Sequence, residues 1–308
     1  MPIRVRKPGL STTIQDRGRL GYSHLGISPA GAADSLSFRI ANLLVGNDDN
    51  APALEMTLLG ATLEFDQAAV VAITGADCES KLGSARVPLN TAVELPAGAV
   101  LSCGSMKTGA RSYLAVQAGF DVPLIMGSAS TDVRGRFGGH EGRRLRSGDV
   151  LRVRPAPLLP IPSLPPEAFD SLYDRGPIRV TRGAQQDWFD TGAFEKLFSC
   201  AYTVSNQSDR AGLRLKGEAL RPHEPRQLLT DGIPLGAIQV PQDGQPIILF
   251  VDQQTTGGYP KIANVITADM HRVGQLRPRE EVRFAEVSMA EAIQALRKQE
   301  RRLKEISP

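Results

Sequence analysis

The chain has 308 residues, of which 41% are hydrophobic and 22% charged, with 36 lysine and arginine residues against 33 aspartate and glutamate residues. This length and composition are typical of a globular protein with two domains and a sizeable core, and they exclude wholesale disorder. A net charge of +3 and an aromatic content of 5% argue against nucleic-acid binding, which needs a concentrated basic surface and stacking platforms.

No apolar stretch approaches the length of a membrane-spanning helix, and the segment Met1 to Lys7 lacks the apolar core of a signal peptide. The three cysteines, Cys78, Cys103 and Cys200, are widely spaced and form no Cys-x-x-Cys pair. They predict buried free thiols rather than a disulfide framework or a zinc site. We therefore expect a cytoplasmic protein without a membrane segment and without a metal site.

The first half of the chain predicts one helix among many short strands. The helix is expected over Ser35 to Val45, with Asp34 as its N-cap and Gly46 closing it. Two interpretations of Asp34 stay open: it satisfies the free amides of the first turn, or the open helix terminus binds an anion. Strand patterns with glycine, proline and aspartate turns surround the helix, among them residues 55–65, 70–75, 95–101 and 113–116.

A glycine- and hydroxyl-rich stretch between Gly119 and Gly142 is a candidate phosphate cradle, because backbone amides and hydroxyls bind phosphates. No Gly-x-x-x-x-Gly-Lys-Ser/Thr motif occurs, so a nucleotide site here would be atypical. His140 lacks a histidine or cysteine partner at ligand spacing and is expected to be a loop residue rather than a metal ligand. The candidate phosphate-binding residues are Ser128, Ser130, His140 and Arg143.

A proline-rich connector, residues 155–175, divides the chain into a domain of residues 1–154 and a domain of residues 176–308. Six prolines between Pro155 and Pro166 remove backbone donors and favour a stiff, extended segment. The two halves end in similar strand-turn-strand patterns, at 145–153 and 276–284. A duplicated module is therefore expected, mainly β with some α, in which each copy is a barrel or closed sheet with one or two helices.

The second half also predicts two helices, one over about Thr191 to Cys200 and a long one at the C-terminus. The long helix begins with a capping box, Ser288 to Glu291, and its basic outer face is expected to be solvated. Docking of this face against another protein chain is the alternative.

The strongest candidate site follows an apolar strand at Ile247 to Val251. Polar side chains come directly after it, and two glycines there allow a ligand to approach the backbone. A polar hairpin loop is the alternative interpretation. We expect Lys261 and Tyr259 to hold and polarise a substrate carbonyl. Asp252 and Gln254 would orient its N–H groups, and Thr256 would also bind substrate.

Two further segments would complete this site. Asp209 and Arg210 are expected on its opposite wall, although they could simply pair with each other, and Gln239 is a further candidate for substrate binding. The chain has no Gly-x-Ser-x-Gly elbow, His-Glu-x-x-His motif or Rossmann fingerprint, which disfavours hydrolysis by a conventional triad or by zinc. A site of carboxylates, amides, a tyrosine and a lysine suits a neutral amide or urea-like substrate.

Six ordered motifs stand out along the chain, at residues 11–22, 29–34, 127–132, 137–143, 207–210 and 253–261. They resemble those of the KipA family, also called allophanate hydrolase subunit two, the biotin-dependent carboxyltransferase-like family, or the C subunit of the prokaryotic ATP-dependent 5-oxoprolinase. The resemblance runs from about residue 9 to 285. One local departure is Arg279-Glu280, where the closing turn of the family usually has Gly-Asp.

The resemblance implies two tandem cyclophilin-like β-barrel domains and a heteromeric complex with a KipI-like B subunit and a LamB/YcsF-like A subunit. It implies opening of 5-oxo-L-proline to L-glutamate with hydrolysis of ATP, held with Mg by the complex, and a chain that is inactive alone. Two alternatives stay open. One is the carboxyltransferase component of a urea carboxylase-type enzyme, which would use biotin, and the other is a regulatory protein that antagonises a KipI-like kinase inhibitor.

Overall fold

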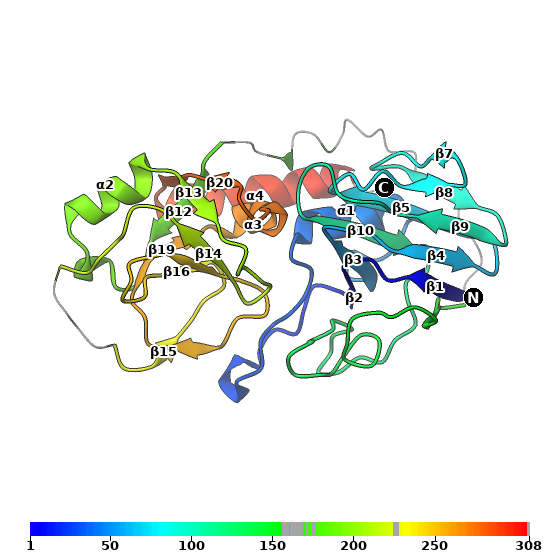
Figure 1. Cartoon of the computed structure of the whole chain (residues 1–308), viewed down its shortest axis with the longest axis horizontal. Helices are drawn as coiled ribbons and strands as arrows, with labels where there is room; N and C mark the ends of the chain where they lie inside the picture. The colour runs from blue at the N-terminus through cyan, green and yellow to red at the C-terminus, as the bar shows by residue number, and fades with distance from the viewer. Residues whose placement is uncertain (156–159, 161–168, 170–171, 174–175, 224–227, 307–308) are drawn as a thin grey trace. The chain divides into compact units, whose positions relative to one another are not determined.

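The computed structural model describes residues 1–155, 160, 169, 172–173, 176–223 and 228–306, and Figure 1 shows their course. The chain forms two compact units: the first comprises Met1–Arg19, Ala30–Ser171 and Glu305–Pro308, and the second Leu20–Pro29 and Leu172–Lys304. Most of the predicted connector at 155–175 lies outside the described residues, so its conformation stays a prediction.

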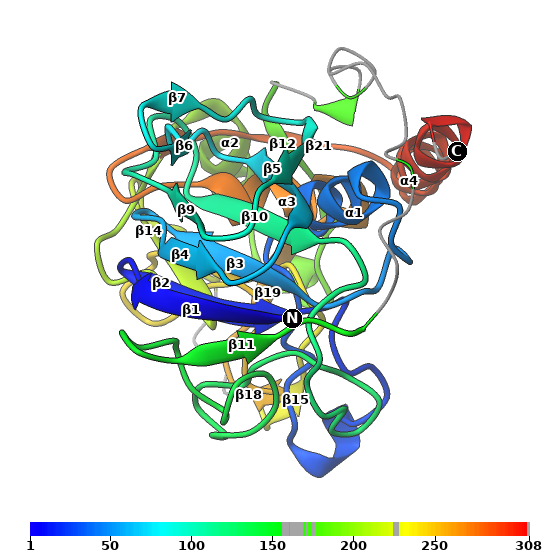
Figure 2. The ribbon, with the colours of Figure 1, turned by 90° about the vertical axis from the view of Figure 1, so that its right-hand side faces the viewer.

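The first unit consists of two antiparallel sheets, drawn from blue to green in Figures 1 and 2. The six-stranded sheet has the order β11-β1-β4-β9-β6-β7, and the five-stranded sheet has the order β2-β3-β10-β5-β8. The strands are β1 (Pro2–Lys7), β2 (Ser11–Gln15), β3 (Ala53–Thr57), β4 (Thr62–Phe65), β5 (Ala69–Gly75), β6 (Lys81–Leu82), β7 (Ala85–Arg86), β8 (Ala92–Leu95), β9 (Ala99–Ser102), β10 (Arg111–Val116) and β11 (Val150–Arg152).

Both sheets of the first unit contribute to one apolar core. Ile3 and Phe65 of the six-stranded sheet and Ile14 and Leu114 of the five-stranded sheet belong to the same cluster and are fully buried. Each such side chain stabilises the fold by about 1.5–3 kcal/mol relative to an exposed one. β10 is buried along its whole length because it lies between β3 and β5 and also packs under α1.

The predicted helix of the first unit is α1 (Ser35–Leu44), one residue shorter than expected. Asp34 is its N-cap: Oδ1 accepts a hydrogen bond from Ser37 N at 2.8 Å, and Oδ2 accepts from Ser37 Oγ at 2.6 Å. Asp34 is completely buried. The first of the two interpretations of Asp34 is therefore confirmed, since its carboxylate already occupies the helix terminus.

The second unit has one large sheet, one small ribbon and three α-helices among its described residues. The helices are α2 (Thr191–Ser199), α3 (Met270–Gln275) and α4 (Met289–Ile306), with short 3₁₀ turns η1 (Ser23–Leu25), η3 (Gln186–Trp188) and η4 (Thr267–Asp269). The strands are β12 (Ile178–Arg182), β13 (Tyr202–Val204), β14 (Gly212–Lys216), β15 (Asp231–Gly232), β16 (Ala237–Gln239), β17 (Ile247–Leu249), β18 (Thr256–Gly257), β19 (Lys261–Val265), β20 (Glu281–Val282) and β21 (Phe284–Glu286).

The large sheet of the second unit is a nearly closed barrel. Its order is β20-β13-β14-β17-β16-β19-β12-β21, so its two outer strands are consecutive in the chain and separated only by Arg283. Val282 pairs with Tyr202 at one end of the sheet, and Phe284 pairs with Ile178 at the other. The mainly β architecture and the barrel are thus confirmed, whereas its likeness to cyclophilin stays a prediction.

The two units differ in strand arrangement although each contains an aspartate-capped helix. Asp190 caps α2 by accepting a hydrogen bond from Ala193 N at 2.8 Å, as Asp34 caps α1. The first unit divides its strands between two sheets, but the second unit gathers eight strands into one.

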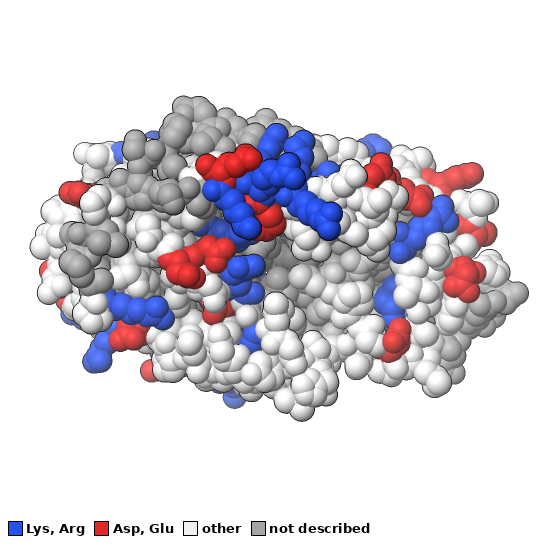
Figure 3. All heavy atoms as spheres, turned by 180° about the vertical axis from the view of Figure 1, so that it is seen from behind, with Lys and Arg blue, Asp and Glu red and all other residues white. Residues whose placement is uncertain are grey.

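The long C-terminal helix α4 begins at the predicted capping box. Ser288 N donates to Glu291 Oε2 at 2.7 Å, and Glu291 N donates to Ser288 Oγ at 3.3 Å. Arg297, Lys298 and Arg301 of this helix are exposed. Figure 3 shows Lys and Arg side chains next to Asp and Glu side chains on the face seen from behind. Within the part of the chain that the structure describes, no helix has both the length and the hydrophobicity needed to cross a bilayer.

The three cysteines are free thiols, as predicted. Cys78 and Cys103 are buried, but Cys200 is only partly buried, because it is the C-cap residue of α2.

Candidate functional site

The predicted polar segment follows β17, and its first polar residue is held by an ion pair. Asp252 is 7% exposed and binds Arg210 through two contacts, Nε to Oδ2 at 2.8 Å and Nη2 to Oδ1 at 2.9 Å. Asp252 N also donates to Arg210 O at 2.8 Å. Because both side chains are largely buried, this pair fixes the start of the polar segment against the turn that precedes β14.

Asp209 contacts its own turn and not Arg210. Its Oδ1 accepts hydrogen bonds from Ala211 N at 2.8 Å and from Gly212 N at 3.2 Å. This is an Asx turn, in which a side chain replaces a backbone acceptor. Asp209 therefore shapes the entry into β14, while its neighbour Arg210 binds Asp252.

Lys261 is the buried cation of the second unit's candidate site. It begins β19, and its side chain is 3% exposed. Its Nζ lies 2.7 Å from Asp231 Oδ2 and 3.4 Å from Gly232 O. Asp231 belongs to the ribbon, the two-stranded sheet of β15 and β18, which is separate from the barrel sheet. Hydrogen bonding to Lys261 is the largest cause that lowers the pKa of Asp231.

Three glutamine amides surround the strand that carries Lys261. Gln239 is the register partner of Lys261 between β16 and β19, and its Nε2 donates to Tyr259 O at 3.4 Å. Gln185 Oε1 accepts a hydrogen bond from Lys261 N at 3.1 Å. At Gly257 of the ribbon, a Cβ atom would lie 3.1 Å from the Nε2 atoms of both Gln239 and Gln254. The structure thus brings two predicted amides together beside the ribbon.

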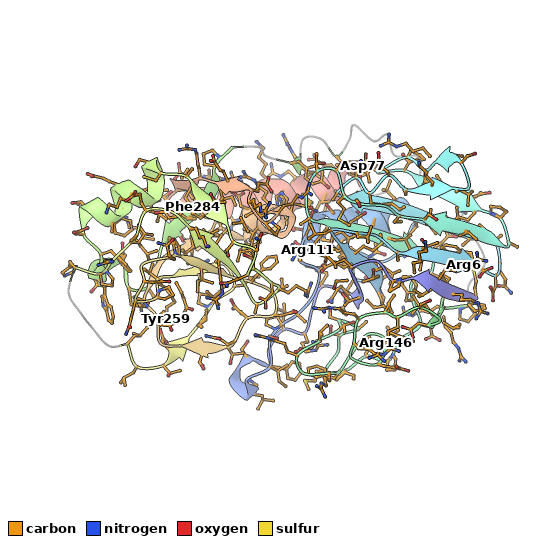
Figure 4. The ribbon with its side chains drawn as sticks, in the orientation of Figure 1. Arg6, Asp77, Arg111, Arg146, Tyr259 and Phe284 are labelled. Carbon is orange, nitrogen blue, oxygen red and sulfur yellow. The ribbon has the colours of Figure 1, made fainter. Side chains whose placement is uncertain are left out.

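The remaining predicted residues lie on the accessible side of this segment. Gln254 and Thr256 are exposed, and Tyr259, labelled in Figure 4, is 45% exposed. The segment thus combines a buried ammonium, buried and exposed amides and an exposed phenol, which are donors and acceptors that suit a polar, uncharged molecule. A polar hairpin loop stays the alternative interpretation, and the burial of the Lys261 side chain is the observation that favours a site.

Gly183 shows how tightly the backbone packs at Lys261. A Cβ at Gly183 would lie 2.2 Å from Lys261 O and 2.7 Å from Lys261 C, distances that require the backbone to move. Gly183 N donates to Ile262 O at 2.9 Å, which locks β12 to β19 at this point. The position of Lys261 therefore depends on the absence of a side chain at residue 183.

In the first unit, the candidate phosphate-binding serines face a carboxylate. Ser128 Oγ and Ser130 Oγ donate to Asp16 Oδ1 at 2.6 and 2.5 Å, and Ala129 N donates to Asp16 Oδ2 at 2.6 Å. Ser128 and Ser130 are fully buried, and Asp16 is 2% exposed. A phosphate at these hydroxyls would meet the negative charge of Asp16, so the two serines do not fit a phosphate.

The other two candidate phosphate-binding residues surround a second carboxylate, Asp149. Arg143 contacts it at 2.7 and 2.9 Å, and His140 Nε2 lies 3.6 Å away. The bond from Arg143 is the main cause that lowers the pKa of Asp149 to about 2. His140 also lines an open cavity of about 560 Å³ in the first unit, together with Arg136 and Arg152. Figure 4 labels Arg146 in the same loop region.

No metal site is evident in this part of the protein. Among the residues that the structure describes, no three His, Cys, Asp or Glu side chains form a group suited to a metal ion.

Three residues of these clusters were not predicted as site residues from the sequence: Asp231, Gln185 and Asp16. Asp231 stands in an Asp-Gly pair, which is also an ordinary turn signal, and Gln185 lies in a polar stretch without a distinctive pattern. Asp16 is part of a glycine-punctuated turn, but its serine partners are 112 and 114 residues away along the chain. Only the fold brings these groups together.

The family profile described as "Carboxyltransferase domain, subdomain A and B" matches residues 25–286. The chain belongs to this family. Among its relatives is the 5-oxoprolinase C subunit of Escherichia coli, which is 40% identical over 305 residues, covering 99% of this chain and 97% of that protein. The 5-oxoprolinase C subunit of Haemophilus influenzae is 39% identical, covering 94% of this chain and 92% of that protein.

Larger members of the family contain a region similar to this chain. Urea amidolyase of Saccharomyces cerevisiae is 36% identical and covers 93% of the chain, which spans only 17% of that protein. The crystal structure of the K. lactis urea amidolyase matches with a TM-score of 0.93 at 33% identity, over 99% of this chain and 20% of that one. The Kluyveromyces lactis urea carboxylase structure matches with a TM-score of 0.92 at 34% identity, over 99% of this chain and 29% of that one.

Proposed function

We propose that this chain is the C subunit of an ATP-dependent 5-oxoprolinase, which opens 5-oxo-L-proline to L-glutamate. The observation that carries the proposal is end-to-end similarity. The chain covers 97% of the E. coli 5-oxoprolinase C subunit at 40% identity, whereas it covers only 17% of the yeast urea amidolyase at 36% identity. We expect the chain to act in the cytoplasm in a complex with a KipI-like B subunit and a LamB/YcsF-like A subunit, and to be inactive alone.

The chemistry of the Lys261 site supports this function. The substrate has a cyclic amide, whose carbonyl oxygen gains negative charge when the carbonyl carbon is attacked. A fixed ammonium in a water-poor site stabilises such an oxygen more strongly as its charge develops. Gln239 and Gln254, with amides near Gly257, and the exposed Tyr259 and Thr256 supply donors and acceptors for the rest of the substrate.

Asp252 and Arg210 contribute to the site by holding its wall. Arg210 binds the Asp252 carboxylate through a bidentate contact. We therefore assign two roles to Asp252: it holds Gln254 and its neighbours in position, and it orients the N–H groups of the substrate.

The residues predicted to bind phosphate do not fit ATP. Ser128 and Ser130 donate to Asp16, and Arg143 is bound to Asp149 and Glu141. ATP supplies the free energy for opening a stable lactam in this reaction, and we do not propose that the loop of the first unit binds it.

A second candidate function is the carboxyltransferase step of a biotin-dependent, urea carboxylase-type enzyme. The TM-score of 0.92 with the Kluyveromyces lactis urea carboxylase favours it, because the similarity extends over 99% of this chain. Both substrates are amides, so the Lys261 site suits either reaction.

The experiment is to purify the chain with its two partner proteins and to measure ATP-dependent release of glutamate from 5-oxo-L-proline. We expect Lys261→Met to lower kcat by roughly a hundredfold, the usual effect of removing an oxyanion donor. Lys216→Met, which removes an exposed lysine on β14, is the matched control and should leave kcat within about twofold.

The outcomes separate the candidates. An assembled complex that releases no glutamate but transfers a carboxyl group from a biotin carrier to urea would favour the second function. Normal turnover of the Lys261→Met complex, with assembly verified by gel filtration, would place the site elsewhere in the protein.

A further inference from the structure

The Lys261 ammonium is held by a residue that lies on the ribbon and not in the barrel. The Lys261 side chain is 3% exposed, whereas that of its partner Asp231 is 50% exposed. Asp231 Oδ1 accepts a hydrogen bond from Gly232 N at 2.7 Å, and its Oδ2 accepts from Lys261 Nζ at 2.7 Å. Asp231 thus reaches inward from the surface to the only charged group of the buried strand β19.

Gln185 connects the same two residues from another element. Its Oε1 accepts from Lys261 N at 3.1 Å, and its backbone N donates to Lys261 O at 3.2 Å. A hydrogen bond from the Gln185 side chain also contributes to the lowered pKa of Asp231. Each of these three residues therefore contacts the other two, although they come from different elements: β19 carries Lys261, the ribbon carries Asp231, and Gln185 directly precedes η3.

We propose that Asp231, supported by Gln185, is the positioning residue for Lys261: it holds the ammonium in place so that one N–H stays directed at the substrate carbonyl. This inference rests on the proposed function, in which Lys261 polarises that carbonyl.

The Lys261 ammonium has three N–H bonds to donate. One donates to Asp231 Oδ2 at 2.7 Å, and a longer contact of 3.4 Å goes to Gly232 O. No other acceptor for Nζ is present among the residues that the structure describes. The tetrahedral group therefore has a donor available for a substrate oxygen while Asp231 remains bound.

Burial makes the carboxylate necessary. An ammonium removed from water is strongly destabilised unless an opposite charge accompanies it, and a flexible four-carbon side chain needs a partner to select one rotamer. Asp231 provides both, because a charged partner at hydrogen-bond distance fixes the direction of Nζ. Asp231 is itself kept ionised, since its pKa is lowered first by the bond from Lys261.

A double-mutant cycle in the assembled complex tests this inference. We expect Asp231→Asn to lower kcat about tenfold with little change in KM, because the interaction lost is with the group that acts in the transition state. In the Lys261→Met background, the same Asp231→Asn change should lower kcat no further, since Asp231 would act only through Lys261. Asp231→Glu should recover part of the activity, and Gln185→Leu should have a smaller effect of about threefold.

Glu286→Gln is the matched control. Glu286 pairs with Arg182 at 2.7 Å and is 40% exposed, which resembles the exposure of Asp231, but it lies on β21. Its kcat should stay within about twofold of the unchanged complex.

A second measurement does not depend on activity. Labelling of Lys261 by an amine-directed acylating reagent is followed by mass spectrometry of the isolated chain. The labelling rate should rise at least about threefold in Asp231→Asn, because the ammonium loses its fixed partner, and it should not rise in Glu286→Gln.

The outcomes distinguish the inference from the function on which it rests. A strong loss in Lys261→Met together with normal kcat and normal labelling in Asp231→Asn would overturn the positioning role and leave the proposed function intact. Additive losses in the double variant would also overturn it, since Asp231 would then act independently. Normal kcat in Lys261→Met would refute the assigned site, and the positioning role with it.

Discussion

The two units each contain a polar cluster that the sequence predicts as a ligand site, but the clusters differ in what their charged group contacts. In the first unit, Asp16 accepts hydrogen bonds from Ser128 Oγ, Ser130 Oγ, Ala129 N and Gly18 N, at 2.5 to 2.8 Å. In the second unit, Lys261 binds a carboxylate that is 50% exposed and carried by a separate ribbon.

We infer from this contrast that the Asp16 cluster is structural, whereas the Lys261 cluster is the proposed binding site. Asp16 is 2% exposed and accepts hydrogen bonds from four donors, three of them buried and one, Gly18 N, partly buried, so its charge is satisfied. Lys261 is as deeply buried, but its partner reaches the surface and one of its donors has no acceptor among the described residues. We therefore propose the second cluster, in which the buried charge has an accessible partner, as the binding site.

The largest change in stability is expected at Asp16, and it tests most directly whether the first cluster is structural. Asp16→Ala leaves two buried hydroxyls and two backbone amides without their acceptor, each at a cost of about 1–3 kcal/mol, partly relieved by water. We expect the free energy of unfolding to fall by about 4 kcal/mol in urea titrations. Asp66→Ala, at an exposed aspartate of the same unit, should change it by less than about 0.5 kcal/mol. An unchanged or increased stability in Asp16→Ala would indicate a functional site in the first unit.

A smaller effect is expected at Asp149, the ion-pair partner of Arg143. It tests whether this pair, which also belongs to the first unit, is structural. The Arg143 guanidinium holds the pKa of Asp149 at about 2, below the usual value of 3.8. A carboxylate whose pKa is lower in the folded than in the unfolded state stabilises the fold. This stabilisation is complete at pH values above the pKa of the unfolded state, and it is lost as the pH falls through the pKa of the folded state. We therefore expect Asp149 to contribute about 2 kcal/mol at pH 7, and this contribution to disappear between about pH 4 and pH 2.

The measurement is urea unfolding of the unchanged protein and of Asp149→Asn at several pH values. The difference in stability between the two proteins should shrink toward acid pH. A difference that stays constant from pH 7 to pH 2 would contradict the assigned ion pair, and with it the conclusion that Arg143 is a structural residue.

The smallest effect concerns Asp209, which the sequence places on the wall of the second unit's site. Asp209→Ala removes the acceptor for Ala211 N and Gly212 N at an exposed turn. We expect a loss of about 1 kcal/mol of unfolding free energy, comparable to the loss of a helix cap. Asp209→Asn, whose amide oxygen can still accept, should lose less than half of that. Equal losses in the two variants would refute the turn assignment.

Local structure could be predicted from the sequence where neighbouring residues determine it. The helix α1 with its Asp34 cap and the capping box of α4 lie where hydrophobic spacing and capping residues placed them. The strand β17 begins at the predicted Ile247 but ends at Leu249, two residues earlier than expected. Such features depend on contacts between residues a few positions apart, which a pattern in the sequence records directly.

The partners within the sites could not be predicted, because they are distant in the sequence. Lys261 and its partner Asp231 are 30 residues apart, and Asp252 and Arg210 are 42 residues apart. Ser128 and Asp16 are 112 residues apart. The same serine-glycine loop can cradle a phosphate or enclose a carboxylate, and only the folded chain shows that an aspartate occupies its centre. The pairing of adjacent charges, Asp209 with Arg210, is likewise replaced by a long-range pair.

The single residue between β20 and β21 makes the barrel of the second unit sensitive to chain length. Val282 and Phe284 both point into the core, and exposed Arg283 lies between them, so alternation is maintained as the chain passes from one end of the sheet to the other. Figure 4 labels Phe284, which packs against Tyr202 with ring centroids 6.1 Å apart. One inserted residue at this point would turn either Val282 or Phe284 outward and reopen two strand edges to other chains. Insertion of two residues would preserve the alternation, so an aggregation-prone protein is expected from odd insertions here and a folded one from even insertions.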